Sequence, residues 1–186
     1  MIVILSGVSG AGKDTIKRIL MRKDGRIKTL PSYTTREKRV NEIEGQNYYY
    51  VSKEKFKEMI DNNEFYEYSV HHGNYYGTNK KLLNERIKNN IVLKDIDVNG
   101  TEDLLKIFRG TEIKIISIFL NISKQEMLRR LENRDDKLKQ EEIELRMNRY
   151  DYEMNHIGIY DYVIKNEDAE KTSNIILDII KREQEQ

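Results

Sequence analysis

A glycine-rich segment near the N-terminus carries the residue types that bind phosphate groups. It reads Gly7-Val8-Ser9-Gly10-Ala11-Gly12-Lys13, which fits the pattern G-x4-G-K, and it lies between an apolar stretch and an amphipathic stretch. Glycine lets the backbone turn round a phosphate with its N–H groups pointing inward, and the N-terminus of a following helix adds positive partial charge. Lys13 can bridge the β- and γ-phosphates of a nucleotide. The flanking stretches favour this interpretation over a glycine-rich turn with a chance lysine.

The two residues that follow Lys13 are the candidates for a metal site. The usual pattern places Ser or Thr directly after the lysine as a ligand of Mg²⁺, whereas this chain has Asp14 and then Thr15. A carboxylate in the first turn of a helix is stabilised by roughly 0.3–1 kcal/mol, so Asp14 is either a helix-start anion or a ligand of Mg²⁺ through water. Thr15 is the better candidate for a phosphate contact.

A second cluster suited to phosphate follows in the chain. Arg36 and Arg39 stand three residues apart, and Tyr48 and Tyr76 come from later predicted strands. An arginine side chain presents a planar fork of N–H donors that matches phosphate oxygens. These residues predict a clamp for a second phosphate, with a solvated charged loop as the alternative.

Alternating strands and helices must position both clusters. Ile2–Leu5 is a continuous apolar run, typical of a strand buried on both faces, and Ile16, Ile19 and Leu20 fall on one face of a helix. Another short strand is predicted to end near Pro31. Further strands are predicted at residues 48–51, 65–70, 74–76, 91–98, 114–120 and 162–164, with helices around 56–60, 104–108, 127–131, up to about 156, and 175–180.

This order of elements predicts an α/β fold with one domain over residues 1–186. A parallel sheet flanked by helices forms the P-loop core, which we assign to residues 1–31 and 81–186. Residues 32–80 change to short strands around a helix capped by Ser52, and they predict an inserted α+β lobe.

The composition excludes several classes of protein. The 33 Lys and Arg residues against 32 Asp and Glu give a net charge of +1, which argues against a nucleic-acid coat or a polybasic membrane tail. The chain has no cysteine, which excludes disulfides, thiolate zinc sites and cysteine nucleophiles. No apolar run approaches the roughly 20 residues of a membrane span, and we expect a cytoplasmic protein. We interpret His71, His72 and His156 as surface or packing residues.

Several motifs along the chain resemble those of the guanylate kinase family. They are Ser-x-Thr-Thr-Arg-x-x-Arg-x-x-Glu-x-x-Gly-x-x-Tyr from Ser32, Glu-Phe-x-Glu up to Glu67, Gly-x-Tyr-Tyr-Gly-Thr up to Thr78, and Asp-Ile-Asp-x-x-Gly from Asp95. With the phosphate loop and the run Tyr-Asp-Tyr-Val-Ile-x-Asn that ends at Asn166, the resemblance spans nearly the whole chain. It implies phosphoryl transfer from ATP to GMP or dGMP, giving ADP and GDP, with Mg²⁺ as cofactor.

The resemblance also implies two sets of nucleotide-binding residues. The GMP set contacts guanine and its phosphate, and comprises Ser32, Arg36, Arg39, Tyr48, Glu67, Tyr76, Gly77, Thr78 and Asp97. The ATP set surrounds the phosphate loop, and comprises Gly7, Ser9, Gly10, Ala11, Gly12, Lys13, Asp14, Thr15, Arg130 and Asn166, the last near adenine. The candidates for catalysis are the cations Lys13, Arg39, Arg134 and Arg146. The inserted lobe would bind GMP, and residues of about 124–150 would form a lid.

The chemistry of guanine accounts for an acidic residue in this set. Guanine offers N1–H and N2–H as adjacent donors, and a carboxylate such as Glu67 can accept both, whereas adenine presents a lone pair at N1. A site built on buried hydrogen bonds rejects a mismatched substrate by roughly 10⁴-fold or more. The GMP phosphate is already an oxyanion at pH 7, so the transfer needs positioning and charge neutralisation rather than a general base.

The chain departs from the family pattern at other places besides Asp14, and other functions stay open. Asp135-Asp136 follow Arg134 where glycine is usual, and Lys94 stands in a predicted buried strand where an aliphatic residue is usual. The alternatives are a related P-loop kinase with a different phosphate acceptor, or a catalytically weak guanylate-kinase-like binding module. The expected partners are the nucleotides, with no nucleic acid and no membrane, for a monomer or a homodimer.

Overall fold

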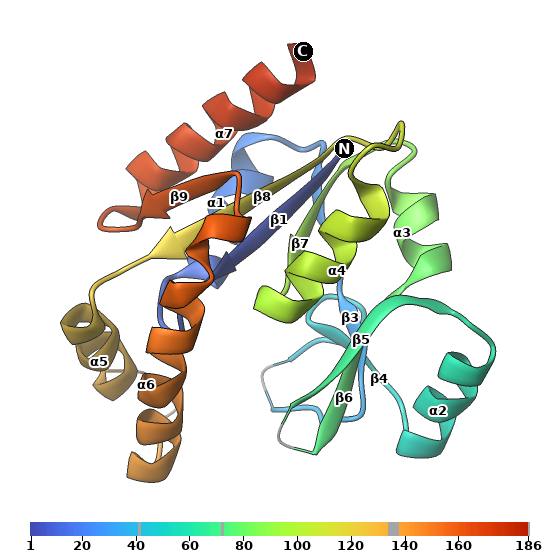
Figure 1. Ribbon diagram of the computed structural model, residues 1–186, viewed down its shortest axis with the longest axis horizontal. Coiled ribbons are helices and arrows are strands. Elements are labelled where there is room, and N and C mark those ends of the chain that lie inside the picture. The colour runs from blue at the N-terminus through green and yellow to red at the C-terminus, as the bar shows by residue number, and fades with distance from the viewer. Residues whose placement is uncertain (41, 72, 134–137, 186) are drawn as a thin grey trace. The chain divides into compact units, whose positions relative to one another are not determined.

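The computed structural model describes residues 1–40, 42–71, 73–133 and 138–185 (Figure 1). The chain forms two compact units, one made of Met1–Ile2 and Arg26–Ile115, the other of Val3–Gly25 and Ile116–Gln186. Arg134, Asp135, Asp136 and His72, which the sequence analysis singled out, lie outside the described residues.

The elements follow one another much as the sequence predicts. The strands are β1 (Ile2–Gly7), β2 (Ile27–Thr29), β3 (Ser32–Thr34), β4 (Tyr48–Tyr50), β5 (Phe65–His71), β6 (Asn74–Asn79), β7 (Ile91–Asp95), β8 (Ile115–Asn121) and β9 (Tyr162–Lys165). The helices are α1 (Lys13–Lys23), α2 (Lys53–Asp61), α3 (Lys80–Arg86), α4 (Val98–Phe108), α5 (Lys124–Glu132), α6 (Gln140–Asn155) and α7 (Ala169–Glu185), with a short 3₁₀ turn η1 (Ile157–Ile159).

The strands belong to two sheets. A five-stranded sheet has the order β2-β7-β1-β8-β9, and a four-stranded sheet has the order β4-β3-β6-β5. β2 pairs in parallel with β7, where Ile27 lies opposite Ile91, and β8 pairs in parallel with β9, where Ile118 lies opposite Tyr162. The predicted α/β fold with a parallel sheet is confirmed.

In the unit that contains the phosphate loop, buried strands are accompanied by two helices that pack on each other. β1 is buried throughout and β8 almost throughout, because nearly all of their residues are aliphatic. α1 buries the three apolar residues that the periodicity predicts, and α7 lies beside it (Figure 1). Arg22 and Lys23 in the last turn of α1 each lie 2.6 Å from the carboxylate of Glu170 in the first turn of α7. Because these ion pairs are partly exposed, they add little to the free energy of unfolding. Their main effect is to fix which ends of α1 and α7 lie together.

In the other unit, the four-stranded sheet carries its own small core. Ser52 caps α2 by accepting the N–H of Lys55 at 3.1 Å, as the sequence predicts. Phe56 and Met59 on the buried face of α2 pack with Phe65 of β5. The predicted inserted lobe thus contains a sheet and a helix, while its boundaries at residues 32–80, like those of the lid, stay predictions.

One predicted strand is too long, and the strand β3, the helix α3 and the short turn η1 were not predicted. Residues 91–98 were expected to form one strand, but β7 ends at Asp95 because Asp97 accepts the N–H of Gly100 at 3.1 Å and so begins α4. β3 has only three residues and α3 follows β6 without a turn, so neither leaves a periodic pattern. In the described part of the chain, no helix has the length and apolar character that a membrane crossing requires.

Candidate functional site

The phosphate loop has the backbone of an anion-binding turn. Gly10 and Gly12 have φ of 73° and 90°, in the left-handed region that other residues rarely adopt. Gly12 is the N-cap of α1, and among the described residues no side chain caps that helix, so its first N–H groups are left for a ligand. At Gly7 a Cβ would lie 2.4 Å from the carbonyl oxygen of Leu120, so the strand can enter the loop only as glycine.

Two predicted cations lie against this loop. The ammonium of Lys13 donates to the carbonyl of Gly7 at 2.8 Å and to that of Val8 at 3.4 Å. The guanidinium of Arg146, from α6, donates to the hydroxyl of Ser9 at 3.1 Å. The structure therefore brings Lys13, Ser9 and Arg146 together, as the sequence predicts.

Arg130 and Asn166 tie the loop to the segment that follows β9. The amide nitrogen of Asn166 donates to the carbonyl of Ala11 at 2.6 Å. Arg130 of α5 donates to the carbonyl of Gly10 at 3.2 Å and to the backbone carbonyl of Asn166 at 3.0 Å. At Gly12 a Cβ would lie 2.7 Å from this amide nitrogen, so glycine is needed there for space as well as for φ. The two residues predicted to join the loop in one site do contact it.

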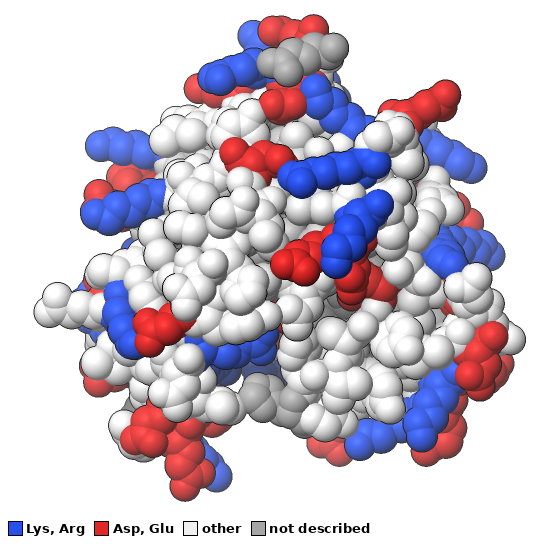
Figure 2. All heavy atoms as spheres, viewed as in Figure 1, with Lys and Arg blue, Asp and Glu red and all other residues white. Residues whose placement is uncertain are grey.

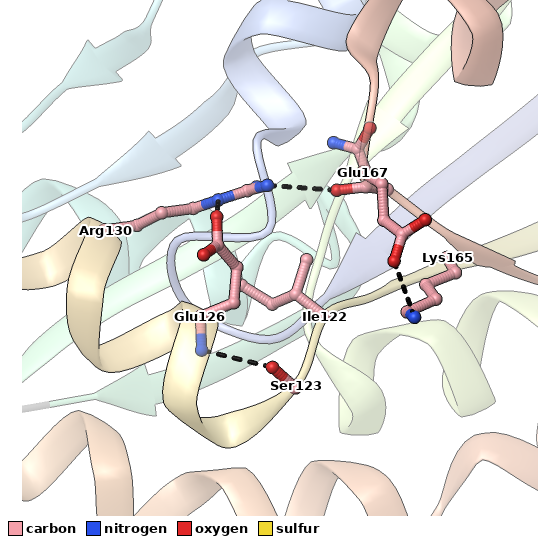
Figure 3. A pocket seen from close by; sticks show the side chains of 7 residues that line it. Ile122, Ser123, Glu126, Arg130, Lys165 and Glu167 are labelled. Carbon is pink, nitrogen blue, oxygen red and sulfur yellow. Dashed lines mark hydrogen bonds and ion pairs between the residues drawn. The ribbon is translucent and has the colours of Figure 1, made fainter.

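A cavity of about 390 Å³ lies at this cluster (Figure 3). Its lining residues come from α5 with the residues just before it, and from the end of β9 with the residues just after it. They are Ile122, Ser123, Glu126, Arg130, Lys165, Asn166 and Glu167. Glu126 holds Arg130 at 2.7 Å, and Lys165 pairs with Glu167 at 2.6 Å. The side-chain oxygen of Asn166 is buried and has no hydrogen-bond partner within the described ranges. Because Asn166 also lines the cavity, this unpaired acceptor is a candidate contact for a ligand that donates an N–H group.

The metal candidates lie in the first turn of α1. Asp14 is 91% exposed, and its carboxylate pairs with Lys17 at 2.7 Å, which supports the helix-start role. The hydroxyl of Thr15 accepts from Arg18 at 3.5 Å. Among the residues that the structure describes, no group of three or more His, Cys, Asp or Glu could hold a metal ion. Mg²⁺ in kinases uses one or two protein oxygens with phosphates and water, so the oxygens of Asp14 and Thr15 fit this ion without a protein cage.

The four-stranded sheet carries six of the nine predicted acceptor residues, with at least one on each strand. Tyr48 lies on β4, Ser32 on β3, Tyr76, Gly77 and Thr78 on β6, and Glu67 on β5. Ser32 is opposite Tyr48, and Glu67 is opposite Thr78. The ring centroids of Tyr48 and Tyr76 are 5.9 Å apart. Strand pairing thus brings together residues that are far apart in the sequence.

Glu42 organises the arginine cluster. Its carboxylate accepts from the guanidinium of Arg36 at 2.6 Å, from the backbone N–H of Arg39 at 2.9 Å and from the hydroxyl of Tyr50 at 2.8 Å. Burial alone would raise the pKa of Glu42, but these three hydrogen bonds outweigh it and lower the pKa to about 2. Arg36 also lies 5.2 Å from the ring centroid of Tyr48, whereas the side chain of Arg39 is exposed.

Glu67 is a buried carboxylate in this unit. It is 7% exposed and accepts a hydrogen bond from the hydroxyl of Thr78. Burial raises the pKa of Glu67, against the opposing effects of the Lys94 charge and the Thr78 hydrogen bond. Lys94 in turn donates to the hydroxyl of Ser32. The predicted base contacts Ser32, Glu67 and Thr78 therefore belong to one cluster that also includes a lysine.

Asp97 has a histidine as a partner. Nε2 of His71 lies 3.1 Å from a carboxylate oxygen of Asp97, and the ring of His71 is 5.8 Å from that of Tyr76. His71 therefore contacts two predicted site residues, and its interpretation as a surface or packing residue stays a prediction. His156 contacts the backbone carbonyl of Tyr152 at 2.7 Å, which fits a packing role.

Four residues of the acceptor cluster were not predicted from the sequence to belong to a site: Glu42, Tyr50, His71 and Lys94. Three of them left a signal. Glu42 belongs to the quoted motif, Lys94 is a charge in an otherwise apolar strand, and His71 is four residues from Glu67, hence on the same face of a strand. Tyr50 left none, because a strand of three tyrosines does not indicate which one meets a carboxylate.

Charges of both signs are interspersed on the face shown in Figure 2. This pattern agrees with the net charge of +1. On this face, neither sign of charge gathers into a single large patch.

The fold and the phosphate loop define a P-loop α/β protein, and comparisons with known proteins narrow this class. The guanylate kinase family model matches residues 1–183. The chain is 39% identical over 182 residues to a guanylate kinase of Prochlorococcus marinus, covering 97% of this chain and 96% of that protein. It is 40% identical over 190 residues to a guanylate kinase of Bartonella henselae, covering 97% and 82%.

A solved structure gives the same result. The crystal structure of guanylate kinase from Anaplasma phagocytophilum matches with a TM-score of 0.80 and 31% sequence identity, covering 100% of this chain and 87% of that one. The chain belongs to the guanylate kinase family. The resemblance inferred from the sequence motifs is thereby confirmed.

Proposed function

We propose that this chain transfers the γ-phosphoryl group of ATP to GMP or dGMP, giving ADP and GDP or dGDP. The observation that carries the proposal is Glu67, a buried carboxylate in one cluster with Ser32 and Thr78. Such a carboxylate accepts both the N1–H and the N2–H of guanine, a pairing that no other common nucleobase offers in full. Membership of the guanylate kinase family supports the same reaction.

For ATP, we propose that the loop Gly7–Thr15 binds the phosphates. Its main-chain N–H groups and the N-terminus of α1 face the anion, and Lys13 exchanges its loop carbonyls for phosphate oxygens. The cavity at Arg130 and Asn166 is the proposed adenine site, where the unsatisfied oxygen of Asn166 accepts the adenine amino group. Arg146, held at Ser9, is proposed to neutralise charge on the transferred group.

For GMP, we propose that Arg36, Arg39, Tyr48 and Tyr76 bind the phosphate. Glu42 orients the guanidinium of Arg36, which presents its fork of donors, while the exposed side chain of Arg39 is free to reach the reacting oxygens. Ser32, Glu67 and Asp97 are the proposed guanine contacts, with Gly77 and Thr78 beside the base. Glycine is required at position 77 by the core, because a Cβ there would lie 2.9 Å from the Phe65 ring.

In the transfer, an oxygen of the GMP phosphate bonds to the γ-phosphorus of ATP while the bond from that phosphorus to the β–γ bridging oxygen breaks. The attacking oxygen is already ionised, so the protein positions two polyanions and offsets their charge. Thr15, and Asp14 through water, are the proposed ligands of Mg²⁺, which when bound neutralises charge on the β- and γ-phosphates. Arg134 is proposed as a further phosphate contact on its motif alone.

A coupled assay of ATP consumption with GMP, dGMP, AMP, CMP and UMP tests the proposal. We expect kcat/KM for GMP and dGMP to exceed that for AMP by at least about 10³-fold, because AMP would place a lone pair against Glu67. Equal turnover of AMP and GMP would reject the role of Glu67. Binding of GMP without any turnover would identify a binding module, and turnover of another acceptor alone would identify a different kinase.

The remaining expectations stay predictions. We propose that the chain acts in the cytoplasm as a monomer or homodimer and binds neither nucleic acid nor membrane. Sedimentation of the purified chain, with and without both nucleotides, decides its oligomeric state.

A further inference from the structure

Lys94 is a buried cation in a strand whose other interior residues are apolar. It is 1% exposed, and Val92 and Leu93 precede it in β7. Lysine is almost never fully buried unless its charge is paired, because removal of an ammonium from water is strongly unfavourable. An aliphatic side chain would fill this buried position without the cost of desolvating a charge. A role outside packing is therefore the better explanation.

The partners of Lys94 belong to the proposed guanine subsite. Its ammonium donates to the hydroxyl of Ser32 and, at 3.4 Å, to the backbone carbonyl of Leu30. Its charge also acts on Glu67, the buried carboxylate that Thr78 contacts. One cation thus affects two of the residues that are proposed to recognise the base.

We propose that Lys94 is a positioning residue that sets the base specificity of the acceptor subsite, by fixing the hydroxyl of Ser32 as a hydrogen-bond donor and by balancing the charge of Glu67. The inference rests on the proposed function and names how that site selects its substrate. The ligand it selects is a 6-oxopurine nucleotide with N–H groups at N1 and N2.

The first effect concerns the direction of the hydrogen bond at Ser32. A hydroxyl has one hydrogen and two lone pairs, whereas an ammonium can only donate. Because Lys94 donates to the oxygen of Ser32, the hydroxyl hydrogen points away from the ammonium and toward another acceptor. The 6-oxo group of guanine is such an acceptor. The amino group of adenine is a donor at the same place, and the positive potential of Lys94 disfavours a second donor at this oxygen.

The second effect concerns the ionisation of Glu67. Burial and the nearby carboxylates of Asp97 and Asp103, from the start of α4 and from its interior, raise the pKa of Glu67, whereas Lys94 lowers it. An ionised carboxylate accepts both guanine N–H groups, while a protonated one carries a donor of its own. The charge of Lys94 therefore favours the ionised form of Glu67, which is the form that accepts both guanine N–H groups.

Calorimetry on the full chain tests this inference. Kd for GMP and for ATP is measured with the unmodified chain, with Lys94→Met, which keeps the length without the charge, and with Lys88→Met, an exposed lysine in the same unit, as the matched control. We expect Lys94→Met to raise the Kd of GMP at least about tenfold and to change that of ATP less than twofold. We expect Lys88→Met to change neither.

A pH series separates this role from a merely structural one. We expect the ratio of the GMP Kd of Lys94→Met to that of the unmodified chain to rise as the pH falls from 8 to 6, because Glu67 then protonates in the variant first. The ratio cancels the titration of the GMP phosphate itself. Lys94→Gln, which keeps a donor for Ser32 but has no charge, should show the same rise with a smaller loss at pH 8.

The outcomes are distinct. An unchanged GMP Kd in a folded variant, an equal loss for GMP and ATP, or a flat ratio would overturn the inference. Unfolding of both variants, seen in thermal melts, would make Lys94 a folding requirement and would overturn it too. If the unmodified chain binds GMP no better than AMP, the proposed function itself fails. Selective GMP binding by all the variants would refute the role of Lys94 and would leave the proposed function unaffected.

Discussion

The two nucleotide clusters are built from different parts of the polypeptide. Around the phosphate loop, the side chains of Lys13, Arg130 and Asn166 all donate to main-chain carbonyls of the loop. In the acceptor cluster, charged side chains interact with one another: Glu42 with Arg36 of the same loop, and Glu67 with Lys94 of another strand. The first site therefore depends on backbone shape, which glycines supply. The second depends on residue types at positions that strand pairing brings together.

Removal of the lysine of the loop tests the first half of this comparison and has the largest expected effect. We expect Lys13→Ala to lower kcat by at least about 10³-fold while the thermal melt is unchanged, because the loop backbone keeps its shape but the transferred charge loses its cation. Lys171→Ala, an exposed lysine on α7, is the control. A kcat within threefold of the unmodified chain would contradict the assignment of the donor site.

Neutralisation of Glu67 tests the second half. We expect Glu67→Gln to lower kcat/KM for GMP about 10²-fold and to leave KM for ATP within twofold. The reason is that the amide oxygen can accept from one guanine N–H group, whereas the amide NH₂ would face the other. The matched control is Glu85→Gln on the exposed face of α3. A loss that is equal for both substrates would assign Glu67 to folding.

A smaller effect is expected at Glu42, which contacts Arg36 without being a proposed substrate contact. Glu42→Gln should raise KM for GMP about tenfold, and should lower stability by about 1–3 kcal/mol at pH 7. The pKa of Glu42 is lowered from 4.5 to about 2 in the folded chain, so its contribution is present above pH 4.5 and is lost as the pH falls toward 2.

Denaturant titrations between pH 2 and pH 7 measure this contribution. The stability difference between the unmodified chain and Glu42→Gln should be constant above pH 4.5 and should shrink below it. A difference that does not depend on pH would show that the carboxylate charge is not what holds Arg36.

The smallest effect is expected at Asp14, and it sharpens the metal question. Asp14→Ser restores the usual hydroxyl, and because Asp14 is exposed and paired with Lys17, we expect kcat to stay within about twofold at saturating Mg²⁺. Activity measured against Mg²⁺ concentration checks this. A large loss of kcat that persists at saturating Mg²⁺ would contradict this expectation.

The difference between the two clusters also explains which features could be predicted from the sequence. The phosphate loop is local, so Gly7–Lys13 predicts both its shape and its position before α1, and the apolar runs predict β1 and β8. The acceptor cluster is not local. Its members could be named only from a family motif, because the register that sets Ser32 opposite Tyr48 and Glu67 opposite Thr78 leaves no trace in composition or periodicity.

The residues that the sequence did not assign are those whose role depends on a neighbour in space. In the sequence, Lys94 is a departure from the family pattern and His71 is an ordinary strand residue. Only the structure shows that Lys94 contacts Ser32 and that His71 contacts Asp97. The end of β7 was not predicted for a similar reason. Asp97 caps α4 by accepting the N–H of Gly100, and this hydrogen bond cannot be seen in the sequence.

The double use of Asn166 bears on inhibitor resistance. A compound seated in the cavity beside α5 would take its anchor from the unused oxygen of this amide, while the nitrogen of the same group holds Ala11 in the loop. A substitution that evicts the compound would also release the loop. A substitution of Asn166 that confers resistance would therefore lower the activity of the enzyme as well as the affinity of the compound.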